Sequence, residues 1–133
     1  MSVSNPYPVA LPVLLIEDEP GVMAYVRAAL ERSGYAVVGT PSAEEALRIL
    51  QTGNFLGVVS DMRTPGGVSG ADVHAWVVEH RPELASRIVF ITGDVANEDT
   101  LATLRSTGAP CVEKPFRVQQ FISVIEKIMG KAP

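Results

Sequence analysis

The chain has 133 residues, which is the size of one ordinary domain and too short for two well-buried cores. Eleven lysines and arginines against fifteen aspartates and glutamates give a net charge of -4, which argues against nucleic-acid binding through bulk charge. A single cysteine and two histidines exclude an intramolecular disulfide and a Cys/His zinc site. The first apolar run, residues 9–16, is too short for the roughly 20 residues of a membrane span. We therefore expect a cytoplasmic domain that makes no membrane contact of its own.

Five short apolar runs are expected to form the strands of this domain. They show little polar alternation, which is typical of parallel strands that are covered on both faces. The runs are residues 13–16, 35–39, 56–60, 88–92 and 110–113. The preceding residues 1–12, which contain three prolines, are expected to be a flexible lead-in to a domain over residues 13–130.

Segments with helical spacing lie between these runs. A first helix is expected to begin near Pro20, a favourable first-turn residue, and to stop at Gly34. Ser42 and Glu45 predict a capping box for a second helix, which ends near Gly53. Further helices are expected over residues 71–80, 97–106 and 118–129. Because strands and helices alternate, the sequence predicts a three-layer α/β sandwich with right-handed crossovers.

Charged and hydroxyl side chains stand at the ends of the predicted strands. In an open parallel sheet, ligands bind beyond the carboxyl ends of the strands, so these side chains are expected to meet at one edge. They are Glu17, Asp18 and Glu19 after the first strand, Asp61 after the third, Thr92 at the end of the fourth and Lys114 after the fifth.

Such a set suits phosphoryl chemistry. Clustered carboxylates repel one another unless a cation is present, and oxygen ligands suit a hard ion such as Mg²⁺. A carboxylate such as Asp61 can attack phosphorus, while a hydroxyl and an ammonium, here Thr92 and Lys114, can hold the phosphoryl oxygens. Any one of these side chains alone could equally be a solvated strand-end group, and only their recurrence at successive strand ends favours a site.

Four motifs, in chain order, resemble those of the response-regulator receiver domains of two-component signalling. They are Leu-Leu-Ile-Glu-Asp-Glu at 14–19, Val-Val-Ser-Asp-Met-Arg-Thr-Pro-Gly at 58–66, Phe-Ile-Thr-Gly at 90–93 and Glu-Lys-Pro-Phe at 113–116. The resemblance covers residues 13–129. It implies a flavodoxin-like (βα)5 sandwich with a five-stranded parallel sheet in the order 2-1-3-4-5.

The resemblance also implies a role for each residue of the site. Asp61 would be the phosphoacceptor and would take its phosphoryl group from a histidine kinase or a histidine phosphotransfer domain. The ligands of Mg²⁺ would be Asp18 and Asp61, Glu17 through a water, and the backbone carbonyl of Arg63. The phosphoryl oxygens would be contacted by the side chains of Thr92 and Lys114 and by the backbone N–H groups of Met62 and Gly93. In this family the bond corresponding to Lys114–Pro115 is often cis.

Two further features concern the conformational switch of the family and the lifetime of the phosphoryl group. Cys111 occupies the position where many receivers carry a switching Tyr or Phe, so we expect no aromatic switch and read Cys111 as a strand residue. Arg63 and Asp94 occupy positions that flank the approach of water in this family. We hypothesise that they pair across the mouth of the site and tune the phosphoryl lifetime, although each can also be read as a solvated rim charge.

The partner surface is expected beside the acidic pocket. Val22, Met23 and Tyr25 make the apolar stripe of the first helix wider than the core requires, and with Pro115 they are candidate contacts for a kinase or phosphotransfer domain. An ordinary buried helix flank is the other reading of this stripe. Output would pass to a downstream protein effector. The domain would be a regulatory phosphoacceptor rather than an enzyme, either a stand-alone regulator or the C-terminal receiver of a hybrid kinase.

Two other functions use the same architecture. A Mg²⁺-dependent phosphatase with an aspartate nucleophile would need a second acid two residues after it, where Arg63 stands. A flavodoxin-like flavin carrier would need a phosphate-binding loop after the first strand, where residues 17–19 are all acidic. Both fit the sequence less well than a receiver does.

Overall fold

The computed structural model describes residues 11–63, 67–93 and 98–132. Within these ranges, five parallel strands form one sheet in the order β2-β1-β3-β4-β5. The strands are β1 (Val13–Ile16), β2 (Val37–Thr40), β3 (Gly57–Asp61), β4 (Ile88–Thr92) and β5 (Cys111–Glu113). This order confirms the predicted flavodoxin-like sandwich. Residues 1–10 of the predicted lead-in lie outside the described ranges.

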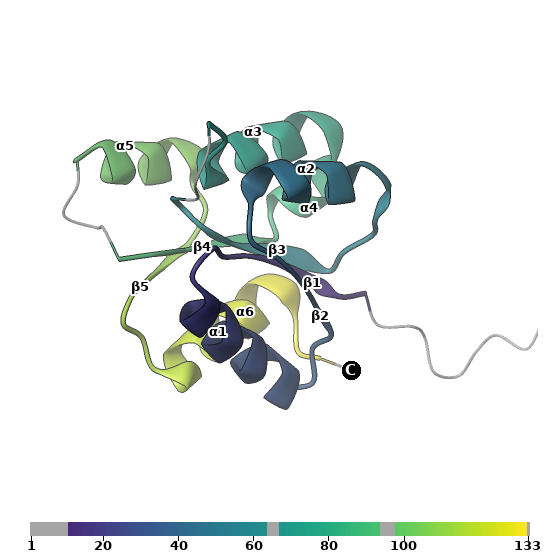
Figure 1. The fold of residues 1–133 in the computed structure, drawn as a ribbon, viewed down its shortest axis with the longest axis vertical. Coiled ribbons are helices and arrows are strands. Elements are labelled where there is room, and N and C mark those ends of the chain that lie inside the picture. Colours follow the sequence, from purple (N-terminus) through teal and green to yellow (C-terminus); the bar gives the residue numbers. More distant parts are fainter. Residues whose placement is uncertain (1–10, 64–66, 94–97, 133) are drawn as a thin grey trace, which may run out of the picture.

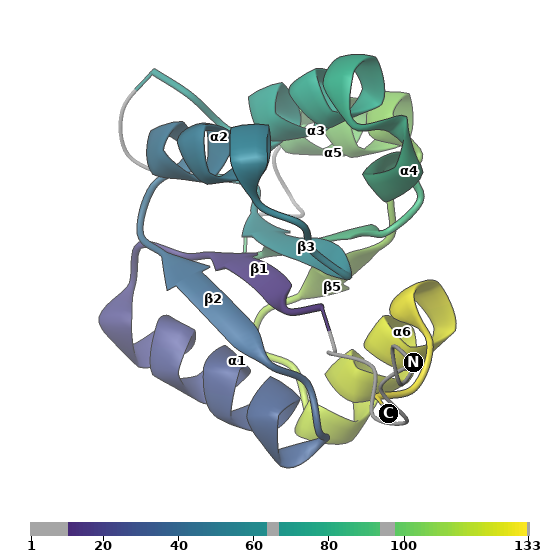
Figure 2. The same ribbon diagram turned by 90° about the vertical axis from the view of Figure 1, so that its right-hand side faces the viewer.

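Helices cover both faces of the sheet (Figure 1). Two of them, α1 and α6, lie on one face, and the others lie on the opposite face, as the turned view also shows (Figure 2). The helices are α1 (Pro20–Arg32), α2 (Ala43–Thr52), α3 (Gly70–His80), α4 (Pro82–Ala85), α5 (Glu98–Thr107) and α6 (Val118–Met129). In the part of the chain that the structure describes, no helix has the length and apolar character needed to cross a membrane.

Each face of the sheet has its own core, which explains why the strand sequences show little polar alternation. Leu15 of β1 packs in the core on the α1 and α6 side, whereas its neighbour Leu14 packs in the core on the α2 and α3 side. Both leucines are completely buried. Leu15 is in register with Gly39 of β2 and Val59 of β3. Burial on both faces thus fixes the sheet and brings the carboxyl ends of its strands to one edge.

The largest differences from the prediction are the start of β2 and one additional short helix. β2 begins at Val37 rather than at residue 35, because the Tyr35 N–H still donates to the Leu30 carbonyl of α1, at 3.0 Å. The short helix α4 was not predicted. Its first residue is Pro82, whose fixed φ suits a first helical turn directly after the end of α3.

The complete capping box lies at the start of α3 and not, as predicted, at the start of α2. At the start of α2, the Ser42 hydroxyl accepts from the Glu45 N–H at 3.1 Å, as expected of an N-cap. The complete capping box, with both of its bonds, lies at Ser69 and Asp72 and starts α3. Asp72 is shorter than the glutamate that is usual at this position of a capping box, but its Oδ2 still accepts a hydrogen bond from the Ser69 N–H at 2.8 Å.

Arg81 caps the end of α2 from a distant part of the chain. Its guanidinium donates to the carbonyls of Leu50 at 2.8 Å and Gly53 at 2.9 Å, and to Asn54 Oδ1 at 3.2 Å. The last carbonyls of a helix have no partner within the helix, so these bonds satisfy groups that would otherwise need water. The contact fastens α2 to the junction between α3 and α4.

We expect Arg81→Ala to lower the free energy of unfolding by about 2 kcal/mol, the typical value of hydrogen bonds from a charged donor. Urea denaturation followed by circular dichroism measures the change. Arg105→Ala removes an exposed arginine of α5 and is the matched control, with an expected change within about 0.5 kcal/mol. Equal stability of the two variants would contradict the capping role of Arg81.

Candidate functional site

The predicted site residues do gather at the carboxyl edge of the sheet. Because β1, β3, β4 and β5 are neighbours in that order, each contributes one side chain to the same edge. The backbone continues this alignment past β5, since the Lys114 N–H donates to the Thr92 carbonyl at 2.8 Å. The four are Glu17 directly after β1, Asp61 at the end of β3, Thr92 at the end of β4 and Lys114 directly after β5.

Three carboxylates lie close together at this edge. One oxygen atom from each of Glu17, Asp18 and Asp61 falls within 4.8 Å of the others. The Glu17 side chain is 0% exposed and that of Asp61 is 9% exposed, whereas Asp18 lies open to solvent. The cluster therefore has a buried interior and one exposed carboxylate. All three ligand groups are oxygens, which suits Mg²⁺ better than a metal that prefers nitrogen or sulfur.

Lys114 bridges the two buried carboxylates. Its Nζ donates to Asp61 Oδ2 at 2.7 Å and to Glu17 Oε1 at 2.9 Å, and its side chain is 18% exposed. Burial by itself would lower the pKa of Lys114, but the hydrogen bonds and charges of Asp61 and Glu17 raise it overall. Burial raises the pKa of Glu17, with a smaller contribution in the same direction from the charge of Asp61, and the Lys114 bond opposes this. The ammonium thus holds two like charges side by side.

The second oxygen of each buried carboxylate is bound by the backbone of the turn that follows it. Glu17 Oε2 accepts from the Glu19 N–H at 3.1 Å, and Asp61 Oδ1 accepts from the Arg63 N–H at 3.0 Å. The Met62 N–H, which we predicted to face a phosphoryl group, donates instead to the Ile91 carbonyl at 3.1 Å. It does so because the pairing of β3 with β4 continues one residue past Asp61.

The remaining predicted residues on this edge come from the end of β4. Thr92 is 1% exposed, and Gly93 directly after it is exposed. A side chain at Gly93 would begin 3.9 Å from Lys114 Cβ, so Gly93 lies beside the lysine. Arg63 is exposed at the mouth of the site, but its predicted partner Asp94 lies outside the described residues. Their pairing therefore stays a prediction.

Cys111 lies in β5, as expected for a strand residue, and pairs with Phe90 of β4. Burial is the main cause that raises the pKa of the Cys111 thiol to about 11, and the charges of Glu113 and Asp61 add to it. A thiol with this pKa is protonated at neutral pH and is a poor nucleophile. Its small side chain also lacks the ring that would report a movement of Thr92.

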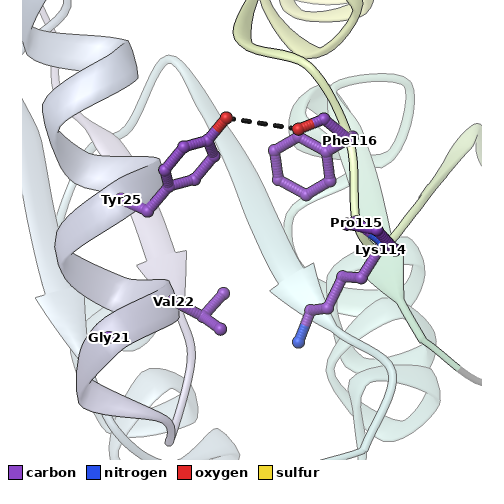
Figure 3. A pocket seen from close by; sticks show the side chains of 6 residues that line it. All are labelled: Gly21, Val22, Tyr25, Lys114, Pro115 and Phe116. Carbon is purple, nitrogen blue, oxygen red and sulfur yellow. Dashed lines mark hydrogen bonds between the residues drawn. The ribbon is translucent and has the colours of Figure 1, made fainter.

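An apolar groove opens beside the charged cluster, between α1 and the loop that joins β5 to α6 (Figure 3). Its volume is about 540 Å³, and Lys114 lies at one end of it. Its lining residues are Gly21, Val22, Tyr25, Lys114, Pro115 and Phe116. The Lys114–Pro115 peptide bond is cis, as the resemblance implied.

Three of the four predicted partner-surface residues meet at this groove, namely Val22, Tyr25 and Pro115. Met23 does not. It lies on the other flank of α1, against β2, where its sulfur would be 3.0 Å from a side chain at Gly39. Phe116 also lines the groove but was not predicted to do so, although it directly follows the predicted contact residue Pro115.

Comparison with known proteins places these features in one family. The chain matches the family model of the response regulator receiver domain over residues 13–126. The response regulator receiver protein CpdR of Brucella abortus is 30% identical over 120 residues, which cover 88% of this chain and 95% of CpdR. A CheY-like receiver domain from Methanospirillum hungatei has the same fold, with a TM-score of 0.79, 20% identity, and coverage of 90% of this chain and 93% of that chain.

Other relatives are longer than this chain. The transcriptional regulatory protein TcrA of Mycobacterium tuberculosis is 25% identical over 121 residues, which cover 91% of this chain and 47% of TcrA. The chain thus spans about half the length of the first relatives that it matches. The matched range 13–126 contains all five strands and every residue of the charged cluster. The chain therefore belongs to the family of response regulator receiver domains, the regulatory phosphoacceptor modules of two-component signalling.

Proposed function

We propose that Asp61 is the phosphoacceptor of this receiver domain. Its donor would be a phosphohistidine on a histidine kinase or phosphotransfer domain, or a small phosphodonor. The role is supported chiefly by the position of the Asp61 carboxylate, which is held between the Lys114 ammonium at 2.7 Å and the Arg63 N–H at 3.0 Å. A carboxylate fixed in this way is oriented for attack, and the ammonium beside it would also lie near the phosphoryl oxygens, which carry the negative charge in the transition state.

Asp18, Asp61 and Glu17 would hold Mg²⁺, and the Arg63 carbonyl would complete the protein's ligands. The presence of one exposed carboxylate, Asp18, beside two buried ones suits an ion that keeps several of its waters. When bound, the ion supplies positive charge that offsets the repulsion between the carboxylates and the incoming phosphoryl group.

The transfer exchanges one bond of phosphorus for another. An Asp61 oxygen forms a bond to phosphorus as the bond from phosphorus to the donor's imidazole nitrogen breaks, and the electron pair stays with that nitrogen. Lys114 would neutralise charge on the phosphoryl oxygens, and the Thr92 hydroxyl and the Gly93 N–H would contact them. The Met62 N–H would join only by leaving the Ile91 carbonyl. Attack of water on phosphorus later releases phosphate and restores the Asp61 carboxylate.

Phosphorylation would act on partners by shifting an existing equilibrium between two surface states, with Thr92 drawn toward the phosphoryl group. Cys111 has no ring that could report this movement, so the domain would not use an aromatic switch. Arg63 with Asp94 would tune the lifetime of the phosphoryl group. A kinase or phosphotransfer domain would dock at the groove of Val22, Tyr25 and Pro115 to deliver the phosphoryl group to Asp61, and the signal would pass to a protein effector. A cytoplasmic location belongs to this proposal, and both a stand-alone regulator and a hybrid-kinase receiver are compatible with it.

We expect the protein to take up one phosphoryl group per chain from acetyl phosphate in the presence of Mg²⁺, and none when the metal is removed with EDTA. Excess Mg²⁺ added after EDTA should restore uptake, which intact-mass spectrometry measures. The metal is needed because the donor's negative charge meets three carboxylates.

This experiment and two further assays separate the proposed function from its alternatives. Equal uptake with and without EDTA would contradict the proposed metal site, and no uptake under any condition would contradict the phosphoacceptor role. Many turnovers of a phosphomonoester by one chain would favour the phosphatase, and retention of a flavin during purification would favour the flavin carrier.

A further inference from the structure

Tyr25 connects α1 to the loop that carries Lys114. Its hydroxyl donates to the Phe116 carbonyl at 3.2 Å, a contact between residues 91 positions apart in the chain (Figure 3). The two rings also pack against each other, with centroids 5.8 Å apart and planes tilted by 51°. Tyr25 is 43% exposed, so this bond forms at the surface and can exchange with water.

The loop is anchored at three points around Lys114. Before the turn, the Lys114 N–H donates to the Thr92 carbonyl of β4 at 2.8 Å. After it, the Phe116 ring stacks on the buried Phe121 of α6, with centroids 5.2 Å apart. Tyr25 supplies the third anchor, and this one attaches the loop to α1. Of the three anchors, this hydrogen bond is the one that can be removed by deleting a single oxygen atom, which leaves the rings and the sheet in place.

Lys114 needs such support because its charge stands at the end of a flexible four-carbon chain. The ammonium has to stay within 2.7 to 2.9 Å of two carboxylates, one directly after β1 and one at the end of β3. If the backbone two residues away gains freedom, the ammonium spends a smaller fraction of its time at Asp61. We propose that Tyr25 is a positioning residue for Lys114, acting through its bond to the Phe116 carbonyl. This inference rests on the proposed role of Asp61 as phosphoacceptor.

Tyr25→Phe tests the inference because it keeps the ring against Phe116 and removes only the hydroxyl. With acetyl phosphate as donor, no partner protein has to dock on the groove. We expect the initial rate of phosphorylation at saturating Mg²⁺ to fall about fivefold, the effect of one ordinary hydrogen bond on an equilibrium.

Tyr35→Phe is the matched control. It also removes a tyrosine hydroxyl bonded to a backbone carbonyl, that of Gly130 at 2.6 Å, but Tyr35 lies just before β2, toward the amino edge of the sheet. We expect it to lower stability and to leave the phosphorylation rate unchanged. A rate loss of the same size in both variants would mean that general loosening of the fold is responsible, and would overturn the inference.

A second comparison tests whether Tyr25 acts through Lys114. In a Lys114→Met background, Tyr25→Phe should cause no further loss of rate, because the group that it positions is gone. A further fivefold loss in that background would show that Tyr25 acts independently of Lys114, and would also overturn the inference.

A third measurement does not use phosphorylation. Acetylation of the Lys114 amine by acetic anhydride, followed by peptide mass spectrometry, should proceed about fivefold faster in Tyr25→Phe than in the wild type, for the same equilibrium reason. Equal labelling would overturn the inference even where phosphorylation works. If labelling responds but the wild type takes up no phosphoryl group, the proposed function fails while the positioning of Lys114 stands.

Discussion

Asp61→Asn is expected to abolish phosphorylation by acetyl phosphate. The amide has nearly the size of the carboxylate, so it can still accept the Arg63 N–H, but it carries no negative charge and does not attack phosphorus. Removal of a nucleophile lowers a rate by at least about a thousandfold, which in this assay means no detectable uptake. Intact-mass spectrometry after incubation with Mg²⁺ and acetyl phosphate measures the result.

Asp99→Asn makes the same chemical change at an exposed position of α5 and serves as the control. It should be phosphorylated at the rate of the wild type. Circular dichroism of both variants checks that the fold is kept. Uptake by Asp61→Asn at an undiminished rate would mean that another group receives the phosphoryl, and would contradict the assignment of Asp61.

Lys114→Met is expected to lower both the phosphorylation rate and the stability of the fold. Methionine keeps much of the length of the side chain but removes the ammonium that touches Asp61 and Glu17. Loss of one preorganised donor at a developing negative charge slows a reaction by about 10²- to 10³-fold. Loss of one partner from a mostly buried ion pair leaves Glu17 and Asp61 facing each other, at a cost of on the order of 3 kcal/mol.

Both effects of Lys114→Met can be measured on the same preparation, the rate by mass spectrometry and the free energy of unfolding by urea denaturation in metal-free buffer. Lys127→Met, which changes an exposed lysine of α6, is the control and should alter neither quantity appreciably. A rate within a factor of two or so of the wild type would be inconsistent with the transition-state role proposed for Lys114.

The parallel sheet and the composition of the site were predictable because they follow from burial, whereas the strand order was implied by the resemblance to receiver domains. Leu14 and Leu15 face opposite cores, so the run that contains them reads as apolar throughout, and this pattern is typical of a parallel strand. Once the strands are parallel, the residues that end them, such as Asp61 and Lys114, must share an edge. No detail of side-chain packing was needed for that step.

Contacts that depend on helix phase could not be predicted in the same way. Val22, Met23 and Tyr25 all lie within one or two turns of α1, and a wide apolar stripe does not say which flank each one takes. Met23 turns toward β2 because Gly39 has no side chain to fill the space there. Val22 and Tyr25 instead meet Pro115, more than eighty positions along the chain.

Backbone bonds beyond the strand ends were equally out of reach. Whether the Met62 N–H can face a phosphoryl group depends on how far the β3–β4 pairing extends, and this pairing binds it to the Ile91 carbonyl. Arg81 reaches a carbonyl 31 residues earlier in the chain, and the sequence around it gives no sign of that partner. Such bonds are set by the assembled fold rather than by local sequence.

The most direct test of Asp61 as phosphoacceptor is to locate the phosphoryl group itself. Borohydride reduces an aspartyl phosphate to homoserine, so the phosphorylated protein can be reduced, digested and mapped by peptide mass spectrometry. We predict homoserine at position 61 in protein treated with Mg²⁺ and acetyl phosphate, and unmodified aspartate there when EDTA is present. Homoserine at Asp18, or a phosphate that survives acid on a serine or threonine with position 61 unmodified, would contradict the account.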